Sequence, residues 1–235
     1  MERNNKLKRL EYWIKARIGK IAFIQREVKR EKHWYGNQYG GFYADPSLIP
    51  KGGIVYSFGI GEDISFDTAM IQKHDCQVYG FDPTPKSINW IANNPPAGKN
   101  FHFHPYGIGQ KTENAIFRLP KNQNHVSGSV FRHQLVDDNN CIEVPLKSFK
   151  DIIKSLNHER IDVLKMDIEG SEYAVIKDIL ESGVYIGQIL VETHERFFQD
   201  GKQRGEQFFS LLKEHGFRIF AISDTYQEIS LVKLS

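Results

Sequence analysis

Short hydrophobic runs and longer amphipathic stretches alternate along most of this chain. The hydrophobic runs predict strands at residues 53–58, 77–81, 101–104, 161–166 and 187–192. Helical periodicity follows many of them, for example at residues 65–74 and 171–182. Strands that alternate with helices form parallel sheets with crossover connections. The pattern therefore predicts an α/β fold, a doubly wound, mostly parallel Rossmann-like sheet.

The two ends of the chain depart from this alternation. Near the C-terminus, a predicted helix at 203–215 precedes apolar runs at 217–223 and 226–233, which predict an antiparallel hairpin. Near the N-terminus, hydrophobic residues recur every three or four positions, at Leu7, Leu10, Ile14, Ile18, Ile21, Ile24 and Val28. This spacing predicts one long amphipathic helix. We therefore expect a basic helical arm, residues 1–33, and an α/β domain, residues 34–235.

Two segments have no clear period. Residues 31–50 are rich in aromatic residues and glycine, which is typical of a loop. Such a loop either covers a substrate or packs beneath the sheet. Residues 121–129 also have a loop composition, and residues 142–149 are consistent with one more strand that enters a helix.

Composition indicates one folded domain with appendages, because the 235 residues are 40% hydrophobic and 26% charged. The two cysteines, Cys76 and Cys141, are too few for a disulfide framework and form no CxxC pair, which favours a reducing compartment. The N-terminal segment lacks the apolar stretch of a signal peptide or membrane span. We therefore expect a cytoplasmic location.

The net charge of +2 conceals a strong asymmetry. Residues 1–33 contain 11 Lys or Arg and 4 acids, whereas the other 202 residues contain 20 and 25. A basic amphipathic helix can make peripheral contact with an anionic membrane or bind nucleic acid. The alternative, which we favour, is an arm packed on its own domain or on a second subunit of a homo-oligomer. Nucleic acid is the partner that we least expect.

The first predicted strand ends in glycine and carboxylate. Gly59 and Gly61 allow the backbone to turn tightly and to approach a ligand. Asp82 ends the next strand, 21 residues after Gly61, near the offset of about 20 residues at which a carboxylate meets a ribose. The pattern predicts an adenosine-containing cofactor. A tight turn followed by a solvated acid is the alternative.

The charge of this turn indicates which cofactor it binds. Glu62 and Asp63 lie where a dinucleotide places its pyrophosphate, and they would repel it. S-adenosylmethionine has no phosphate and carries an ammonium and a sulfonium, which suit an acidic turn. An NAD-type oxidoreductase remains the enzymatic alternative, and a non-catalytic binding module is the third hypothesis.

Two later strands also end in polar residues. Asp167 and Glu169 follow the strand at 161–166, and Glu192 and His194 end the strand at 187–192. Because these strand ends are expected to be neighbours, Asp167, Glu192 and His194 could bind a divalent cation such as Mg²⁺. His194 could instead take a proton from a substrate hydroxyl. Capping of the following helices is the alternative role for the acids.

Two histidines share one face of the strand at 101–104. His102 and His104 have the spacing of a metal pair, but no third ligand is near in sequence, so we expect a polar strand face. Tyr106, Gly107 and Ile108 follow at the end of that strand. They are candidates for an adenine pocket.

Together these segments resemble the FkbM-type methyltransferases, a branch of the class I S-adenosylmethionine-dependent fold. The run LKMDIEGSE, residues 164–172, is similar to the KxDxEGxE signature of that family. Residues 81–83, 104–109 and 190–194 are similar to its second, third and fifth strand motifs. The first motif departs, because residues 57–61 read SFGIG where the family often has an Asp-x-Gly-Ala-Asn loop. That segment looks more like an eukaryote-type branch of methyltransferase-like proteins.

The resemblance implies O-methyl transfer from S-adenosylmethionine to a hydroxyl acceptor, with sugar or glycan hydroxyls as a frequent substrate class. We expect catalytic roles for Asp167 and His194, and metal ligation by Asp167, Glu192 and His194. The expected cofactor contacts come from the ends of four strands, at Gly59, Ile60, Gly61, Glu62, Asp63, Asp82, Pro83, Tyr106, Gly107, Ile108 and Asp167.

Overall fold

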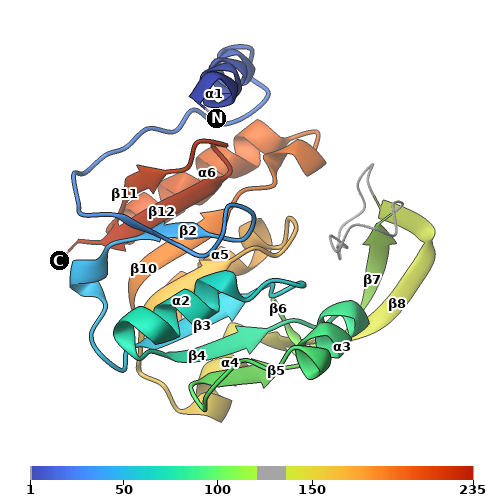
Figure 1. The fold of residues 1–235 in the computed structure, drawn as a ribbon. Helices are drawn as coiled ribbons and strands as arrows, with labels where there is room; N and C mark the ends of the chain where they lie inside the picture. The colour runs from blue at the N-terminus through green and yellow to red at the C-terminus, as the bar shows by residue number, and fades with distance from the viewer. Residues whose placement is uncertain (1, 121–135, 235) are drawn as a thin grey trace.

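The computed structural model describes residues 2–120 and 136–234, and its centre is a seven-stranded sheet (Figure 1). The strand order is β11-β12-β10-β9-β3-β4-β5. The strands are β3 (Ile54–Phe58), β4 (Gln77–Phe81), β5 (Phe101–His104), β9 (Arg160–Met166), β10 (Tyr185–Glu192), β11 (Phe217–Ile222) and β12 (Glu228–Lys233). Neighbours are parallel from β5 to β10, and β12 is antiparallel to both β10 and β11. The predicted fold class, with its C-terminal hairpin, is confirmed.

Helices cover both faces of the sheet because its central strands are hydrophobic on both sides. On β3, Val55 packs into the cluster that contains Met70 of α2, and Tyr56 packs into the cluster that contains Ile152 of α4 and Ile176 of α5. The helices are α2 (Ser65–His74), α3 (Pro85–Asn93), α4 (Phe149–Leu156), α5 (Glu172–Leu180) and α6 (Gly201–Glu214). Buried parallel strands of this kind need cover on both faces.

Two small sheets and two short 3-10 helices complete the fold. The first sheet pairs β1 (His33–Tyr35) with β2 (Phe42–Ala44), and the second contains β6 (Gly107–Gly109), β7 (Glu113–Pro120) and β8 (Val136–Ser148). The 3-10 helices are η1 (Pro46–Leu48) and η2 (Glu195–Phe197). β8 enters α4, as predicted for residues 142–149. The loop predicted at 121–129 lies outside the described residues.

Of the two expectations for residues 31–50, the packing against the sheet is confirmed. Tyr35 and Phe42 are buried in the cluster beneath α2. Tyr39, at the tip between β1 and β2, is 79% exposed and lines a pocket. The segment is therefore a packed entry to the sheet that also lines a pocket, and its role as a cover over a substrate stays a prediction.

The N-terminal arm is shorter as a helix than its hydrophobic pattern predicts. α1 (Glu2–Arg17) ends before Gly19, whose φ is +76°, so the prediction of one helix through Val28 is wrong. The chain then follows the edge of the sheet, where the amides of Glu27 and Val28 donate to the carbonyl oxygen of Ile219. β11 is an edge strand, so its outer backbone carbonyl groups can bind the chain. These hydrogen bonds stabilise an extended chain here in place of a continued helix.

The arm is attached to the domain through residues 12–24. The hydroxyl of Tyr12 donates to the carbonyl of Ala22 and accepts from the amide of Ile24, and its ring stacks on Tyr226 at 4.1 Å. The amide of Ala22 donates to the buried carboxylate of Glu195 at 3.2 Å. These contacts join the arm to the turn between β11 and β12 and to the segment that follows β10.

The apolar side of α1 points away from the domain. Leu7, Leu10 and Ile14 are 63%, 54% and 45% exposed, and they lie roughly opposite Tyr12 around the helix. In the described part of the chain, no helix combines the length and hydrophobicity needed to cross a bilayer. The division of the chain at residue 33 stays a prediction.

Candidate functional site

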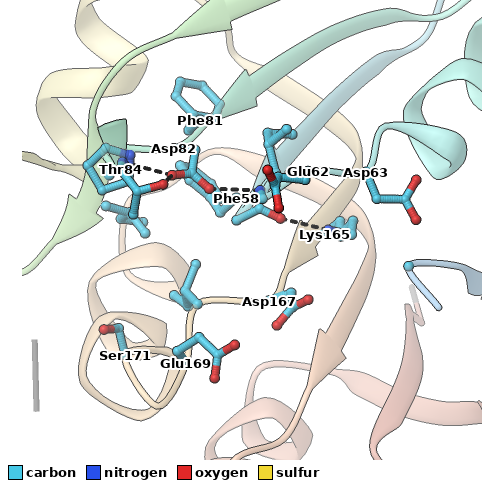
Figure 2. Close-up of a pocket in the computed structure, with 18 of the residues that line it drawn as sticks. Phe58, Glu62, Asp63, Phe81, Asp82, Thr84, Lys165, Asp167, Glu169 and Ser171 are labelled. Atoms are coloured by element: carbon cyan, nitrogen blue, oxygen red, sulfur yellow. Dashed lines mark hydrogen bonds between the residues drawn. The ribbon is translucent and has the colours of Figure 1, made fainter. Parts of the chain in front are cut away.

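A pocket of about 530 Å³ lies beyond the carboxyl ends of the central strands (Figure 2). This is the edge at which open α/β sheets bind ligands. Ten of the predicted site residues line it, namely Gly59, Ile60, Gly61, Glu62, Asp63, Asp82, Pro83, Gly107, Ile108 and Asp167. The structure therefore brings the ends of β3, β4 and β9 together with β6 at one cavity.

The floor of the pocket depends on a glycine. Gly59 has a φ of +81°, and a Cβ built there would overlap the carbonyl oxygen of Asp167. The amide of Gly59 donates to the carbonyl oxygen of Phe81, and the amide of Asp167 donates to the carbonyl oxygen of Phe58, both at 3.0 Å. The ends of β3, β4 and β9 are thereby closed onto one another, and only glycine fits at their junction.

Asp82 organises the turn above this floor. Its Oδ2 accepts from the amide of Gly61 at 2.9 Å, and its Oδ1 accepts from the amide and the hydroxyl of Thr84. Burial raises the pKa of Asp82, and these hydrogen bonds oppose the rise. Oδ1 already accepts two hydrogen bonds, so Oδ2 is the atom that can still accept from a hydroxyl of a ligand.

The two acids of the predicted cofactor turn have partners within the protein. Glu62 forms an ion pair with Lys86 at 3.1 Å. Asp63 accepts from the amide of Ser65 at 2.7 Å, at the start of α2, and from the side chain of Asn37 at 2.6 Å. Asp63 thereby fixes the segment that carries Tyr39 against the pocket.

The ends of β9 and β10 place a histidine among carboxylates. His194 is fully buried, and its Nε2 lies 3.8 Å from Asp167 Oδ1, 3.6 Å from Glu192 Oε1 and 3.3 Å from Glu169 Oε2. One ligand atom from each of Asp167, Glu192 and His194 lies within 4.8 Å of the others. The predicted metal set is therefore assembled, although Glu192 and His194 lie behind the pocket wall rather than on it.

Glu172 holds this histidine in place. Its Oε1 lies 3.0 Å from His194 Nδ1 and accepts from the His194 amide, and its Oε2 accepts from the amide of Gly170. Burial alone would lower the pKa of His194, but Glu172, Glu169 and Glu192 outweigh burial and raise the pKa to about 9. At neutral pH His194 is therefore an imidazolium, and it can act as a ligand or a base only after losing its proton.

Three aromatic candidates lie away from the pocket. Tyr106 packs against the rings of Phe81 and His104 at 5.6 and 5.4 Å and does not line the cavity. His102 stacks on Tyr79 at 4.7 Å and shares a hydrogen bond with Gln77. His102 and His104 therefore belong to a polar, aromatic strand face.

The sequence predicted no role in this site for Lys165 or Glu172, although both lie in the run LKMDIEGSE, and it predicted no contact between Glu169 and His194. Lys165 lines the pocket and is only 4% exposed, and a lysine within an apolar strand is the signal that could have marked it. Glu169 is held at a φ of +52°, and its carboxylate approaches His194. Glu172 is fully buried, and no local pattern connects it with a histidine 22 residues later.

Comparisons with known proteins identify relatives of most of this chain. Residues 23–233 match the model of a family described as a methyltransferase domain. The relatives named "Probable methyltransferase-like protein 24" from Homo sapiens and Rattus norvegicus are each 23% identical over 187 residues, which are 77% of this chain. Those residues cover 44% and 45% of the two relatives, so this chain spans less than half their length.

Solved structures with a similar arrangement have little sequence similarity. Fibrillarin from Aeropyrum pernix aligns with a TM-score of 0.45 and 10% identity, covering 88% of this chain and 84% of that chain. An rRNA methylase from Streptococcus thermophilus aligns with a TM-score of 0.44 and 9% identity, covering 80% and 91%.

Proposed function

This chain belongs to the methyltransferase-domain family, and from that premise we propose that it transfers a methyl group from S-adenosylmethionine to a hydroxyl oxygen of a sugar or glycan. Membership of a class I methyltransferase family agrees with the sequence prediction, and the FkbM-type branch stays a prediction. The observation that carries the proposal is the junction of the Gly59 to Gly61 turn with Asp167. It puts a cofactor cradle beside a cluster of acid and imidazole groups.

The pocket suits S-adenosylmethionine better than a phosphorylated cofactor. Gly59 and Gly61 leave room for close approach, and Asp82 is aimed by Gly61 and Thr84 so that it can accept from a ribose. Gly107 and Ile108 line the side on which adenine would lie. The acids on the pocket wall favour a cationic ligand. When bound, S-adenosylmethionine supplies an electrophilic methyl group on its sulfonium.

The acceptor hydroxyl would be oriented beside Asp167, which lines the pocket and borders the histidine cluster. Positioning supplies most of the rate in such a displacement. Burial and Asp167 raise the pKa of Glu192 to about 8, so Glu192, like His194, must lose its own proton before it can accept one from the hydroxyl.

A divalent cation such as Mg²⁺ would change these roles. His194 Nε2 is buried and has no hydrogen-bond partner among the described residues, and the carboxylates of Asp167 and Glu192 lie within ligand distance of it. Two carboxylates and an imidazole form a donor set that divalent ions accept, on loss of the imidazole proton. Such an ion would supply Lewis-acid activation of the acceptor.

The test is transfer of labelled methyl from S-adenosylmethionine to a panel of glycans and hydroxylated metabolites, with and without EDTA. We expect Asp167→Asn to abolish transfer with little loss of stability; full activity in that variant would refute its role. Calorimetric titration with S-adenosylhomocysteine and NAD distinguishes the other hypotheses. Tight binding of NAD alone would favour an oxidoreductase. Binding of S-adenosylhomocysteine without transfer of a methyl group to any acceptor would favour a binding module.

The outward face of α1 supports a second role, peripheral contact with an anionic membrane. Leu10, Ile14 and Ile18 are exposed together, Arg17 lies over the ring of Trp13, and residues 1–33 carry a net charge of +7. Because two such arms would repel each other, a lipid surface fits better than a second copy of the chain.

Sedimentation of the full chain with phosphatidylcholine vesicles, with and without phosphatidylserine, tests this contact. We expect binding only to the anionic vesicles, weaker at high salt and lost in Leu10→Ser/Ile14→Ser. Equal sedimentation of the variant, or a stable dimer without lipid, would contradict it.

A further inference from the structure

Lys165 is a buried cation in the wall of a pocket that is otherwise acidic. It lies on β9, between Ser57 of β3 and Leu190 of β10, and it is only 4% exposed. Its Nζ donates to the carbonyl oxygen of Gly59 at 3.1 Å, as the dashed line in Figure 2 shows. A lysine at the centre of a sheet is costly to bury unless its charge is compensated.

The surroundings of Lys165 compensate that charge only in part. Asp67 of α2 is buried on the same side of the sheet, and burial raises the pKa of Asp67 although Lys165 opposes the rise. An ammonium group has three donors. The bond to Gly59 uses one of them, and Nζ lies 5.4 Å from the centre of the Phe42 ring, so two donors can still turn toward a ligand.

The charges that line the pocket are unequal in number. The described lining residues contain one cationic side chain, Lys165, and five carboxylates, at Glu62, Asp63, Asp82, Asp167 and Glu169. An amino-acid end of a ligand carries one ammonium and one carboxylate. The ammonium has several acids to approach, whereas Lys165 is the one cationic side chain among the described lining residues that the carboxylate can approach.

We propose that Lys165 Nζ binds the α-carboxylate of the methionine part of S-adenosylmethionine and so fixes the amino-acid end of that ligand. This inference rests on the proposed function, because it assigns one contact within the same pocket. Lys165 also bonds to Gly59, whose turn lies next to the Asp82 contact expected for the ribose. One side chain therefore connects recognition of the amino acid with the shape of the cofactor turn.

Two ligands that differ by one carboxylate test the proposal. S-adenosylhomocysteine and its decarboxylated form, S-adenosyl-3-thiopropylamine, are titrated calorimetrically into the wild-type protein and into Lys165→Met. We expect the wild type to prefer S-adenosylhomocysteine by about tenfold to a hundredfold, the value of a charge-assisted hydrogen bond, and Lys165→Met to lose that preference. Asp82→Asn is the matched control, which should weaken both ligands equally.

Lys165→Met leaves Asp67 buried without its cation, so a second variant guards against a folding defect. Lys165→Met/Asp67→Asn removes both charges together and should also bind the two ligands equally. Equal binding of the two ligands by the wild type would overturn the proposal. So would equal weakening of both ligands in either Lys165 variant, because a purely structural lysine predicts that result. If the wild type binds neither ligand, the proposed function fails, and the inference with it.

Discussion

Replacing Gly59 by alanine tests whether the ends of β3 and β9 close directly onto each other. Gly59 has a φ of +81°, and its Cβ would overlap the carbonyl oxygen of Asp167. Alanine in the left-handed region costs roughly 1–2 kcal/mol. Restoring an ordinary C···O contact would separate the two strand ends by roughly 1.5 Å. Overpacking of this kind costs roughly another 1–3 kcal/mol, so we expect a total loss of about 2–5 kcal/mol.

Gly183→Ala is the matched control for this experiment. Gly183 has a φ of +80°, but nothing lies within 4 Å of a Cβ built there. The control therefore carries the cost of the backbone conformation alone. The difference between the two variants in free energy of unfolding, measured by urea denaturation, isolates the contact between Gly59 and Asp167.

Ligand binding gives an independent measurement on the same pair of variants. S-adenosylhomocysteine should bind more weakly to Gly59→Ala, because the turn that it approaches is displaced, and it should bind normally to Gly183→Ala. Equal losses of stability in the two variants, with unchanged binding in both, would refute the close approach of the strand ends.

Three further changes test other parts of the structure. Burial raises the folded-state pKa of Asp67, so its contribution to stability is full below about pH 4 and falls as the pH rises. The free energy of unfolding of Asp67→Asn, measured by urea denaturation, should therefore increase relative to that of the wild type as the pH is raised above about 4, and a difference that does not change with pH would argue against this. Glu172→Gln should destabilise the fold by about 1–3 kcal/mol, because it weakens the bond to His194, whereas the exposed Glu181→Gln should change little. Tyr12→Phe loses two hydrogen bonds but keeps its ring, so trypsin should release the arm faster; an unchanged cleavage rate would contradict this.

The sequence predicted the central sheet well because its strands are continuous apolar runs that end in glycine or acid. Residues 77–81, for example, form β4 with the predicted bounds. The prediction from sequence failed at the N-terminal arm, where a helix and an extended segment compete for the same residues. The helical spacing of the arm continues to Val28, but the conformation of Gly19 and the hydrogen bonds from Glu27 and Val28 to the carbonyl of Ile219 end the helix at Arg17.

The sequence predicted which strand ends meet at the site. It did not predict which side chains contact one another there. The convergence of Asp167, Glu192 and His194 follows from adjacent parallel strands, β9 and β10. The orientation of Tyr106 does not, because its amide bonds to the carbonyl of His104 in a tight turn that decides which face the ring takes. Such a turn depends on tertiary packing, which no local pattern encodes.

The hydrogen bond from the amide of Ala22 to the carboxylate of Glu195 connects the N-terminal arm to the residue that follows His194. Glu195 is a buried acid directly after His194, and α6 leaves space for its carboxylate at Gly205. Detaching the arm would remove the amide of Ala22 from the carboxylate of Glu195, and Glu195 is the residue directly after His194. Through this bond, a partner that binds the arm, such as a lipid surface, would act on the loop that carries His194, which we propose to be part of the site.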